Sequence, residues 1–457
     1  MSRTLAKHLT TKISLTATGF IFLVLEIIAP LQVQSQDVKS LSLKETIEMS
    51  IKNSPALKAS SAKHEQATAQ VRQALDNKLP DMKVSGSYLY LANPTISTKT
   101  KALEGTDSAG NKTAIPHINQ AMYGILNLSL PIYAGGRIRY GIESAKYLEK
   151  AASLDVEKDK ESVILNTINA YVNLYKASVT VDVIKENLEQ SRHQDSVFAR
   201  LEKNGLLARN DLLKSELQTS NIELTLLDAQ NNLKVANVNM DLMIGLPETT
   251  VIQTDVTEFD KKFSEKTIDE YEQLALQNRK DALALSFRRK AATSGIKIAK
   301  AEQYPAIALT GGYIAANIPH LLTITNAVNI GIGLQYNLSF WKSKAKIAEA
   351  KSREKEIVAN EAQLADNIRL HINQDFENFL LSKKKTDVYK KAVAQAEENY
   401  RITKNKYENA LVNTSDLLEA NVSLLQSKIN LAVAKADVLL AYSKLLETSG
   451  IIEQSIN

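Results

Sequence analysis

The sequence of 457 residues contains no cysteine. This excludes disulfide bonds, thiolate zinc sites, a cysteine nucleophile and a lipid anchor on an N-terminal cysteine. After the N-terminal region, no segment has the ~18–20 consecutive apolar residues that a membrane-spanning helix needs. If the mature protein enters a membrane, it must therefore do so with β-strands.

Clusters of residues with catalytic or metal-binding spacing are also missing. Six histidines are scattered along the chain, and no pair of them has the spacing of metal ligands. Gly135-Gly136 is not followed by the lysine and hydroxyl residues of a phosphate-binding loop. The carboxylates alternate with Lys and Arg, as on a solvated helix face. The sequence therefore predicts no enzyme, no cofactor and no metal site.

The N-terminus has the features of an export signal. A basic segment precedes an apolar run, Ile13–Leu31. Val33 and Ser35 fit a cleavage motif, which predicts a signal peptide over residues 1–35 that is cut before Gln36. The alternative is an N-terminal membrane anchor, which an acidic residue within the run disfavours. Cleavage would lower the formal net charge from +5 to +3, and nothing in that charge indicates nucleic acid as a partner.

Two stretches of about 68 residues, Arg137–Asn204 and Lys342–Asn409, contain no proline and a single glycine, Gly141. A continuous helix of this length would be on the order of 100 Å. Each stretch ends at a break and is followed by another helical stretch, so we expect two long hairpins. Asn210 and Ser415 are the predicted N-caps of the return helices, which we expect to end near residues 243 and 447.

Helical patterns also cover Leu41–Asn77 and Tyr271–Gln303, and each is followed by two stretches with period two. This period predicts four strands, which begin near residues 82, 122, 307 and 329, the last reaching Phe340. We expect a long loop over 92–121 and an irregular segment over 246–266.

Each predicted strand has one apolar face and one small or polar face. Such strands suit a barrel with lipid outside and water inside, whereas the alternative is a soluble sheet with one buried face. Since four strands are too few to close around a pore, several chains would have to contribute. The aromatic residues predicted at the two membrane interfaces are Tyr88, Tyr90 and Tyr313 at one end, and Tyr133 and Trp341 at the other.

The chain is an internal duplication. Five residues of the first half recur 225 positions later, namely Asn53, Pro80, Gly86, Tyr88 and Pro94 as Asn278, Pro305, Gly311, Tyr313 and Pro319. Another set recurs 205 positions later, namely Asp211, Leu212, Leu213 and Gly245 as Asp416, Leu417, Leu418 and Gly450. Repeats of this kind predict a duplicated architecture. The predicted organisation is a signal peptide (1–35), a first repeat (36–249), a linker (250–266), a second repeat (267–451) and a tail (452–457).

The order of elements and several motifs resemble the TolC-like outer-membrane efflux proteins, also called outer membrane factors. The resemblance covers about residues 41–451, and its motifs are Leu41–Ile47, Leu130–Gly136, Asn204–Leu213 and Asn409–Leu418. It implies a homotrimer of mixed α and β structure, in which three chains form a shared 12-stranded β-barrel continued by a periplasmic α-helical barrel. The implied location is the outer membrane of a Gram-negative bacterium.

The resemblance also implies a function and its partners. The channel would be a passive conduit of a tripartite efflux or type I secretion system, with a periplasmic adaptor protein and an inner-membrane transporter as partners. The adaptor would dock on the tips, at Gly205, Leu206, Leu207, Asp211, Ala410, Leu411 and Val412. Rings of acidic side chains at Asp416 and Glu419 would narrow the pore.

Two residues depart from the family pattern. Ala410 stands where the family usually has glycine, so we expect Asn409 to supply the turn. Val412 stands in place of an arginine that helps to lock the closed tip in the best-known member of the family, so the neighbouring Tyr407 lacks that partner. A non-conducting structural coiled-coil protein of the cell envelope is the alternative reading of the chain.

Overall fold

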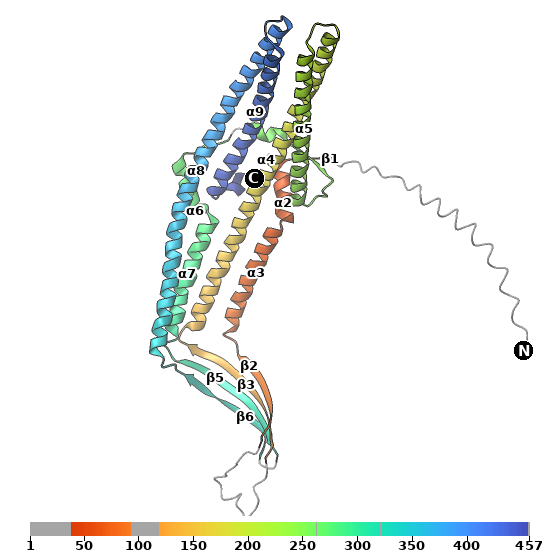
Figure 1. The fold of residues 1–457 in the computed structure, drawn as a ribbon. Helices are drawn as coiled ribbons and strands as arrows, with labels where there is room; N and C mark the ends of the chain where they lie inside the picture. Colours follow the sequence, from red (N-terminus) through yellow and green to blue (C-terminus); the bar gives the residue numbers. More distant parts are fainter. Residues whose placement is uncertain (1–37, 93–117, 262, 320–321, 456–457) are drawn as a thin grey trace, which may run out of the picture.

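The computed structural model describes residues 38–92, 118–261, 263–319 and 322–455. The expected signal peptide and most of the expected loop over 92–121 lie outside these residues. The molecule is elongated, with a sheet at one end and the tips of two helical hairpins at the other (Figure 1).

The two halves of the chain contain corresponding elements. The first half consists of β1 (Val38–Leu41), α2 (Leu43–Asn53), α3 (Pro55–Asp76), β2 (Asp81–Tyr90), β3 (Gln120–Ala134), α4 (Arg137–Lys203) and α5 (Arg209–Ile244). Next come β4 (Val251–Thr254) and η3 (Val256–Asp260). The second half consists of α6 (Ile268–Asn278), α7 (Lys280–Ala301), β5 (Ala306–Ile318), β6 (Leu322–Gln335), α8 (Phe340–Glu408), α9 (Thr414–Thr448) and η4 (Ile452–Ser455). Helices α4 and α8 confirm the two predicted long helices.

The duplication extends to hydrogen bonds. The same capping box begins both halves, with Ser42 and Glu45 at α2 and Thr267 and Glu270 at α6. In each box the side chain of the cap accepts a backbone N–H of the first turn, and the glutamate accepts the backbone N–H of the cap. These pairs are again 225 positions apart, so the sequence repeat is a repeat of local structure.

The prediction of a single helix over Leu41–Asn77 and another over Tyr271–Gln303 is wrong, because each segment forms a short helix followed by a longer one. Ser54 ends α2 and caps α3, whose first residue is Pro55. Proline is tolerated at this position because its missing N–H would have no helical partner there. In the second half the break falls at Arg279.

We had expected the segment over 246–266 to be irregular. This expectation is wrong in part, because the segment contains β4 and η3. Strand β4 pairs in parallel with β1, which the sequence analysis missed. The buried Tyr171 of α4 holds this pair, since its hydroxyl donates to the carbonyl of Leu41 (2.9 Å) and accepts the N–H of Asp255 (2.7 Å). The linker between the repeats is therefore held against the first repeat at the middle of the molecule.

The four long strands form one antiparallel sheet in the order β2-β3-β5-β6. Strand β6 ends at Gln335, and not at Phe340 as expected, although the alternation of apolar residues continues. The reason is that Gln335 pairs with Ala306, the first residue of β5, so β6 has no partner beyond it. Pro305 precedes Ala306 and cannot donate a ladder hydrogen bond.

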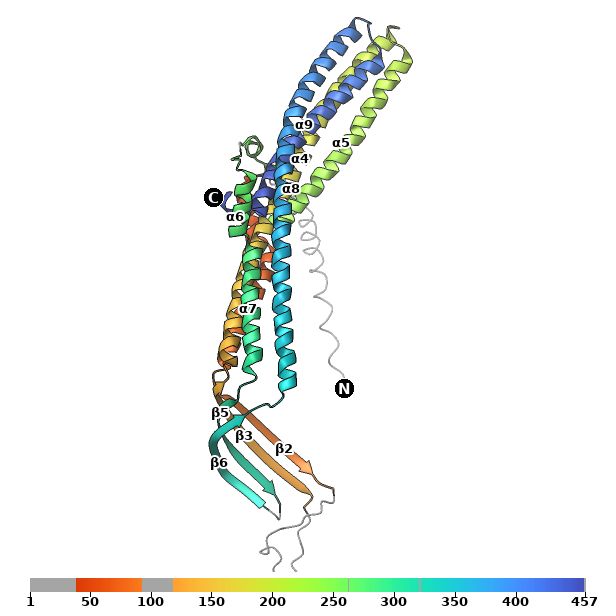
Figure 2. The same ribbon diagram turned by 90° about the vertical axis from the view of Figure 1, so that its left-hand side faces the viewer.

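The helices form a curved layer that continues the sheet (Figure 2). Near the sheet, α4 packs between α3 and α7, and α8 packs against α7. Toward the tips, α4 packs between α5 and α9, and α8 packs against α9. The main hydrophobic core lies between these two regions and includes Ile164, Tyr171, Met240 and Ile372. None of the helices among the described residues is both long and apolar enough to cross a membrane.

Candidate functional site

The sheet has an apolar face that is open to the surroundings. Residues paired across antiparallel strands share a face, and the pairing places on one face Met82, Val84, Tyr88, Tyr90, Met122, Leu126, Leu128, Leu130, Leu309, Tyr313, Val328, Ile330, Ile332 and Leu334. Ile330 is 82% exposed and Val328 is 78% exposed. An exposed apolar surface of this extent indicates an interaction with an apolar medium.

The opposite face of the sheet carries mainly small and polar residues. It includes Lys83, Ser85, Ser87, Asn127, Ser129, Ala308, Thr310, Gly312, Asn329, Gly331 and Gly333. The apolar residues that interrupt this face are most numerous toward the end far from the helices and include Leu89, Tyr123, Ile125, Ile314, Ile318, Leu322 and Ile324. The two faces therefore differ as those of a barrel wall with lipid outside and water inside.

Most of the predicted interface aromatics lie near an end of the sheet. Tyr88 and Tyr90 lie at the end far from the helices, and Tyr133 lies at the helix end, where it pairs with Ile307. A β-bulge between Pro131 and Tyr133 brings Tyr133 onto the apolar face, which simple alternation from Leu130 would not do.

Two further aromatics complete the predicted set. Trp341 is in the first turn of α8, also at the helix end of the sheet. Tyr313 was expected at the far end but lies nearer the middle, paired with Leu126 and Val328. The placement was wrong because the sequence does not give the register of β5 against its neighbours.

Both lateral edges of the chain are open from the sheet to the tips. Strands β2 and β6 each have one neighbour. On the same two sides lie α3 and α5 at one edge and α8 at the other (Figure 1). An open edge leaves backbone N–H and C=O groups unpaired, which is especially unfavourable in a membrane.

Helix α5 carries a second apolar face, which the sequence analysis missed. Its residues, here called the α5 seam, are Leu213, Leu217, Leu224, Leu227, Val235 and Leu242. All six are exposed, while Leu212, Ser215, Thr219 and Ile222 of the same helix are buried. At the other edge α8 exposes Val358, Leu370, Leu381 and Val388. Apolar residues that recur at intervals of 4 and 7 are typical of helix-packing seams. The sequence shows this spacing in α5, so the seam could have been predicted from it.

The two hairpin tips have the same turn. Gly205 has φ +71°, and Leu206 donates its N–H to the carbonyl of Leu201 (2.8 Å). In the second tip Ala410 has φ +57°, and Leu411 donates to Lys406 (2.9 Å). The expectation that Asn409 supplies the turn is wrong, because Asn409 has φ −98° and the left-handed residue is Ala410. An alanine in this conformation costs on the order of 1 kcal/mol.

The return helices do not begin with the predicted caps. The N-cap of α5 is Ala208, not Asn210, and no side chain caps it. The N-cap of α9 is Asn413, not Ser415, and it forms a capping box with Asp416. Asn413 accepts the N–H of Asp416 (3.0 Å), and the carboxylate of Asp416 accepts the N–H of Asn413 (3.2 Å).

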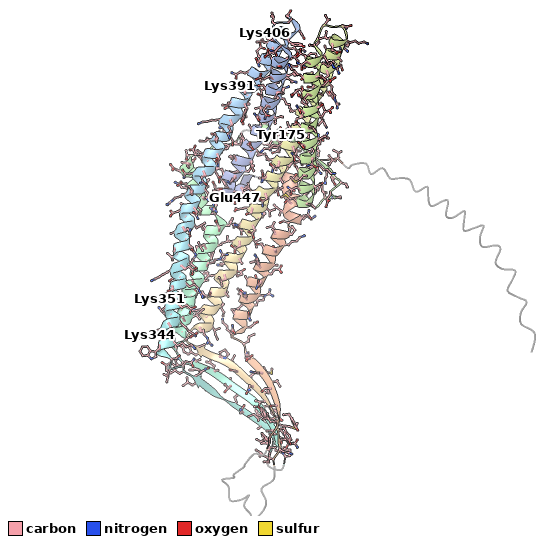
Figure 3. The ribbon with its side chains drawn as sticks, in the orientation of Figure 1. Tyr175, Lys344, Lys351, Lys391, Lys406 and Glu447 are labelled. Atoms are coloured by element: carbon pink, nitrogen blue, oxygen red, sulfur yellow. The ribbon has the colours of Figure 1, made fainter. Side chains whose placement is uncertain are left out.

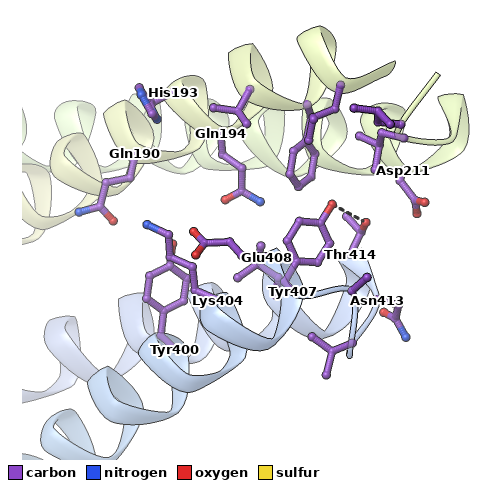
Figure 4. A pocket seen from close by; sticks show the side chains of 18 of the residues that line it. Gln190, His193, Gln194, Asp211, Tyr400, Lys404, Tyr407, Glu408, Asn413 and Thr414 are labelled. Atoms are coloured by element: carbon purple, nitrogen blue, oxygen red, sulfur yellow. Dashed lines mark hydrogen bonds between the residues drawn. The ribbon is translucent and has the colours of Figure 1, made fainter. Parts of the chain in front are cut away.

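The docking residues predicted at the tips lie close together. Leu206 and Leu411 are 74% and 73% exposed, at corresponding positions of the two turns. Between the tips lies a cleft of about 1130 Å³, which Leu206, Leu207, Asp211, Ala410 and Val412 help to line. Figure 4 shows this cleft between the end of α4 and the end of α8.

Tyr407, which was expected to lack an arginine partner, has other contacts in the cleft. Its ring packs against Phe198 with 5.5 Å between centroids, and its hydroxyl accepts a long hydrogen bond from Thr414 (3.4 Å). Phe198 also packs with Leu212 and Leu417, so each hairpin contributes to a small apolar cluster at the tips. This cluster joins the two tips without the arginine.

The two predicted constriction residues are both exposed on α9. Asp416 takes part in the capping box, and Glu419 lies three residues further along the same helix. Among the described residues, no group of three or more His, Cys, Asp or Glu side chains is arranged to hold a metal ion.

A partly buried charged cluster joins the repeats at the C-terminal end of α9. Glu161 of α4 is 5% exposed, and burial raises the pKa of its carboxyl to about 7 against the opposing effect of Lys280. Arg279 donates two hydrogen bonds to Asp281 (3.0 and 2.5 Å) and one to the carbonyl of Thr448 (3.3 Å). The sequence pattern did not distinguish Glu161 from the exposed carboxylates of α4, because the sequence does not report which of them the neighbouring helices bury.

Comparisons with known proteins agree with this geometry. The model of the family described as outer membrane efflux protein matches residues 46–246 and 272–450. The chain is 21% identical to the outer membrane protein TolC of Escherichia coli (strain K12) over 85% of this chain and 78% of that protein. A shorter match to TolC of Salmonella enteritidis is 30% identical and covers 37% of this chain and 34% of that protein. The crystal structure of the outer membrane protein VceC from Vibrio cholerae superposes with a TM-score of 0.73 at 19% identity, over 89% of this chain and 96% of that one.

Proposed function

Since this chain belongs to the outer membrane efflux protein family, we propose that it is the outer-membrane channel of a tripartite efflux or type I secretion system. It is located in the outer membrane, and its helices extend into the periplasm. The proposed function is a passive path for exported molecules, in which the chain performs no catalysis.

The observation that carries this proposal is the four-stranded sheet with one apolar face and two open edges. Three copies of the sheet would supply twelve strands. Strands β2 and β6 run in opposite directions, because the four strands alternate along the sheet. Pairing β6 of one chain with β2 of the next would therefore continue the antiparallel order and close the barrel, as lipid requires.

The same closure accounts for the apolar helix edges. When β6 meets β2 of the next chain, α8 meets α3 and α5 of that chain, since these helices lie on the same two edges. The α5 seam would then be covered by the apolar residues of α8. We therefore propose a homotrimer whose helices continue the barrel wall as a tunnel.

We place the docking surface for a periplasmic adaptor protein at the two tips, with an inner-membrane transporter behind the adaptor. The supporting geometry is the pair of matched turns, each of which exposes a leucine beside the tip cleft. Exposed apolar residues grouped at the end of an elongated protein are typical of a protein interface.

The docking proposal predicts the effect of one charge at the tips. Leu411→Asp should reduce chemical crosslinking to the adaptor in cells by about tenfold, because a buried unpaired carboxylate at an interface costs at least ~1.4 kcal/mol. Gln273→Asp adds the same charge at an exposed position of α6, which is far from the tips and on neither open edge, and it should leave crosslinking unchanged. Equal crosslinking of both variants, with trimers intact, would remove the docking proposal.

We also propose that Asp416 and Glu419 form the acidic constriction. Asp416→Asn with Glu419→Gln removes both charges, and the asparagine can still accept the N–H of Asn413, so the capping box is kept. Single-channel recordings should show lower cation selectivity for this double variant, because rings of carboxylates attract cations. Selectivity identical to that of the wild type would place the constriction elsewhere.

The alternative is a non-conducting structural coiled-coil protein of the cell envelope. Such a rod has no need for a sheet that is apolar on one face and mainly small or polar on the other. Extraction with alkaline carbonate separates the two proposals, because a barrel stays with the membrane whereas a peripheral rod is released as a monomer.

A further inference from the structure

Basic residues gather where the sheet meets the helices. Lys342 and Lys344 lie in the first turns of α8 beside Trp341, and all three side chains are exposed. Trp341 is 86% exposed, and the ammonium of Lys344 lies 5.7 Å from the centroid of its ring. Figure 3 shows Lys344 at the sheet end of α8, with Lys351 further along and Lys391 near the tips.

The first hairpin has the same arrangement. Helix α4 begins with Arg137, and Arg139 follows two residues later, both exposed. Neither α4 nor α8 has an acidic residue in its first turn, although that position normally favours acids. In the described part of the chain, none of Arg137, Arg139, Lys342 and Lys344 forms an ion pair, whereas the neighbouring Lys346 pairs with Glu302 (2.5 Å). These four cations are therefore available to an external anion.

The cations lie directly beyond the apolar face of the sheet. That face ends at Leu334 on β6 and at Tyr133 on β3, and α8 and α4 begin a few residues later. The surface is therefore apolar on the sheet side of this junction and basic on the helix side. This change matches the boundary between acyl chains and phosphates in a membrane. Tryptophan is enriched at the same boundary, and long basic side chains extend toward it.

We propose that Arg137, Arg139, Lys342 and Lys344, with Trp341, form a basal cation belt that binds the phosphates of anionic phospholipids in the leaflet nearest the helices. This inference rests on the membrane placement of the sheet in the proposed function. Lys and Arg near a membrane surface attract anionic headgroups, and arginine can hold a phosphate with two hydrogen bonds. In a trimer the belt would contain every one of these residues three times, around the whole circumference.

A lipid suits this surface better than a soluble anion does. The belt adjoins a wide apolar face, so one phospholipid can place its acyl chains against Leu334 and its phosphate against Lys342 or Lys344. A free phosphate would use only the cations and would gain nothing from Trp341. The bound lipid would fix the height of the barrel in the membrane.

Trp341 is the only tryptophan in the sequence, so its fluorescence reports on the belt alone. The experiment uses the purified mature protein in phosphatidylcholine vesicles that contain either brominated phosphatidylglycerol or brominated phosphatidylcholine at the same fraction. Bromine quenches tryptophan only at short range. The brominated phosphatidylglycerol should quench Trp341 by about twofold more, because cations concentrate anionic lipid around the protein.

Two variants with equal loss of charge make the test specific. The belt variant combines Arg137→Gln, Arg139→Gln, Lys342→Gln and Lys344→Gln, and it should lose the excess quenching by the anionic lipid. The control variant replaces Lys384, Lys385, Lys390 and Lys391 with glutamine as well. These four lysines lie on α8 about 60 Å from the belt, so this variant should keep the excess quenching by the anionic lipid. If the belt variant does not form trimers, the smaller variant Lys342→Gln with Lys344→Gln is used instead. It removes half of the belt charge and should halve the excess quenching by the anionic lipid.

The outcomes separate this inference from the proposed function. Equal quenching by the two lipids in the wild-type protein would overturn the belt and leave the channel untouched. Excess quenching by the anionic lipid that persists in a folded belt variant would also overturn the belt. Absence of quenching by either lipid would contradict the membrane placement itself, and with it both proposals.

Discussion

Leu217→Asp combined with Leu224→Asp should abolish the heat-modifiable trimer in membrane extracts. Both leucines belong to the α5 seam and are exposed in the single chain. In the closed tunnel they would be covered by α8 of the neighbouring chain. Two carboxylates buried there without partners would each cost several kcal/mol, and the cost is repeated at three interfaces.

A matched variant separates the seam from a general effect of charge. Asn221→Asp with Thr225→Asp adds the same two charges to exposed positions of α5 that lie outside the seam. This control should migrate as a trimer at low temperature and as a monomer after heating. Trimers that persist in the Leu217 and Leu224 double variant would mean that α5 does not pack against another chain.

Glu161→Gln should stabilise the protein at alkaline pH. The pKa of Glu161 is raised from the ordinary 4.5 to about 7, so the folded state binds this proton more tightly than the unfolded chain does. The stability that this group contributes is therefore complete below about pH 4.5 and is lost as the pH rises through about 7. Well above pH 7 the buried charge costs up to about 3 kcal/mol, which glutamine avoids.

The measurement is the dissociation temperature of the trimer at about pH 5 and about pH 9, by gel migration after heating. The wild-type value should fall at the higher pH, and Glu161→Gln should reduce this fall. Glu143→Gln is the control, since Glu143 also lies on α4 but pairs with Lys297 (3.8 Å), away from Glu161 and Lys280. A Glu161→Gln protein that is less stable than the wild type at about pH 9 would contradict the assignment.

Long-range patterns were predicted from the sequence more reliably than helix ends. The two long helices followed from the absence of proline over about 68 residues, and the duplication followed from two constant offsets. The breaks at Ser54 and Arg279 did not, because Pro55 is compatible with a first helical turn and Arg279 has no breaking side chain. Helix boundaries depend on single hydrogen bonds, which periodicity does not report.

The caps illustrate the same limit at the tips. Asn413, Thr414 and Ser415 are three consecutive candidates for one N-cap. The capping-box spacing selects Asn413, because the acidic Asp416 lies three residues after it. For α5 no such rule helps, since its N-cap is an alanine.

Register was the other property that the sequence did not determine. Alternation fixes which residues share a face of one strand, but the neighbours decide how far along the sheet each residue lies. Tyr313 therefore lies nearer the middle than expected, and the bulge at Pro131 moves Tyr133 to the apolar face. The α5 seam, by contrast, was visible as leucines four and seven residues apart and was overlooked.

Several copies of this chain are proposed to enclose a water-filled path across a membrane. The most direct test is the single-channel conductance of the purified mature protein in a planar lipid bilayer. We expect discrete, uniform, cation-selective steps from the trimeric protein. Protein that is shown to be folded and trimeric but that never conducts would contradict the claim and favour the structural rod.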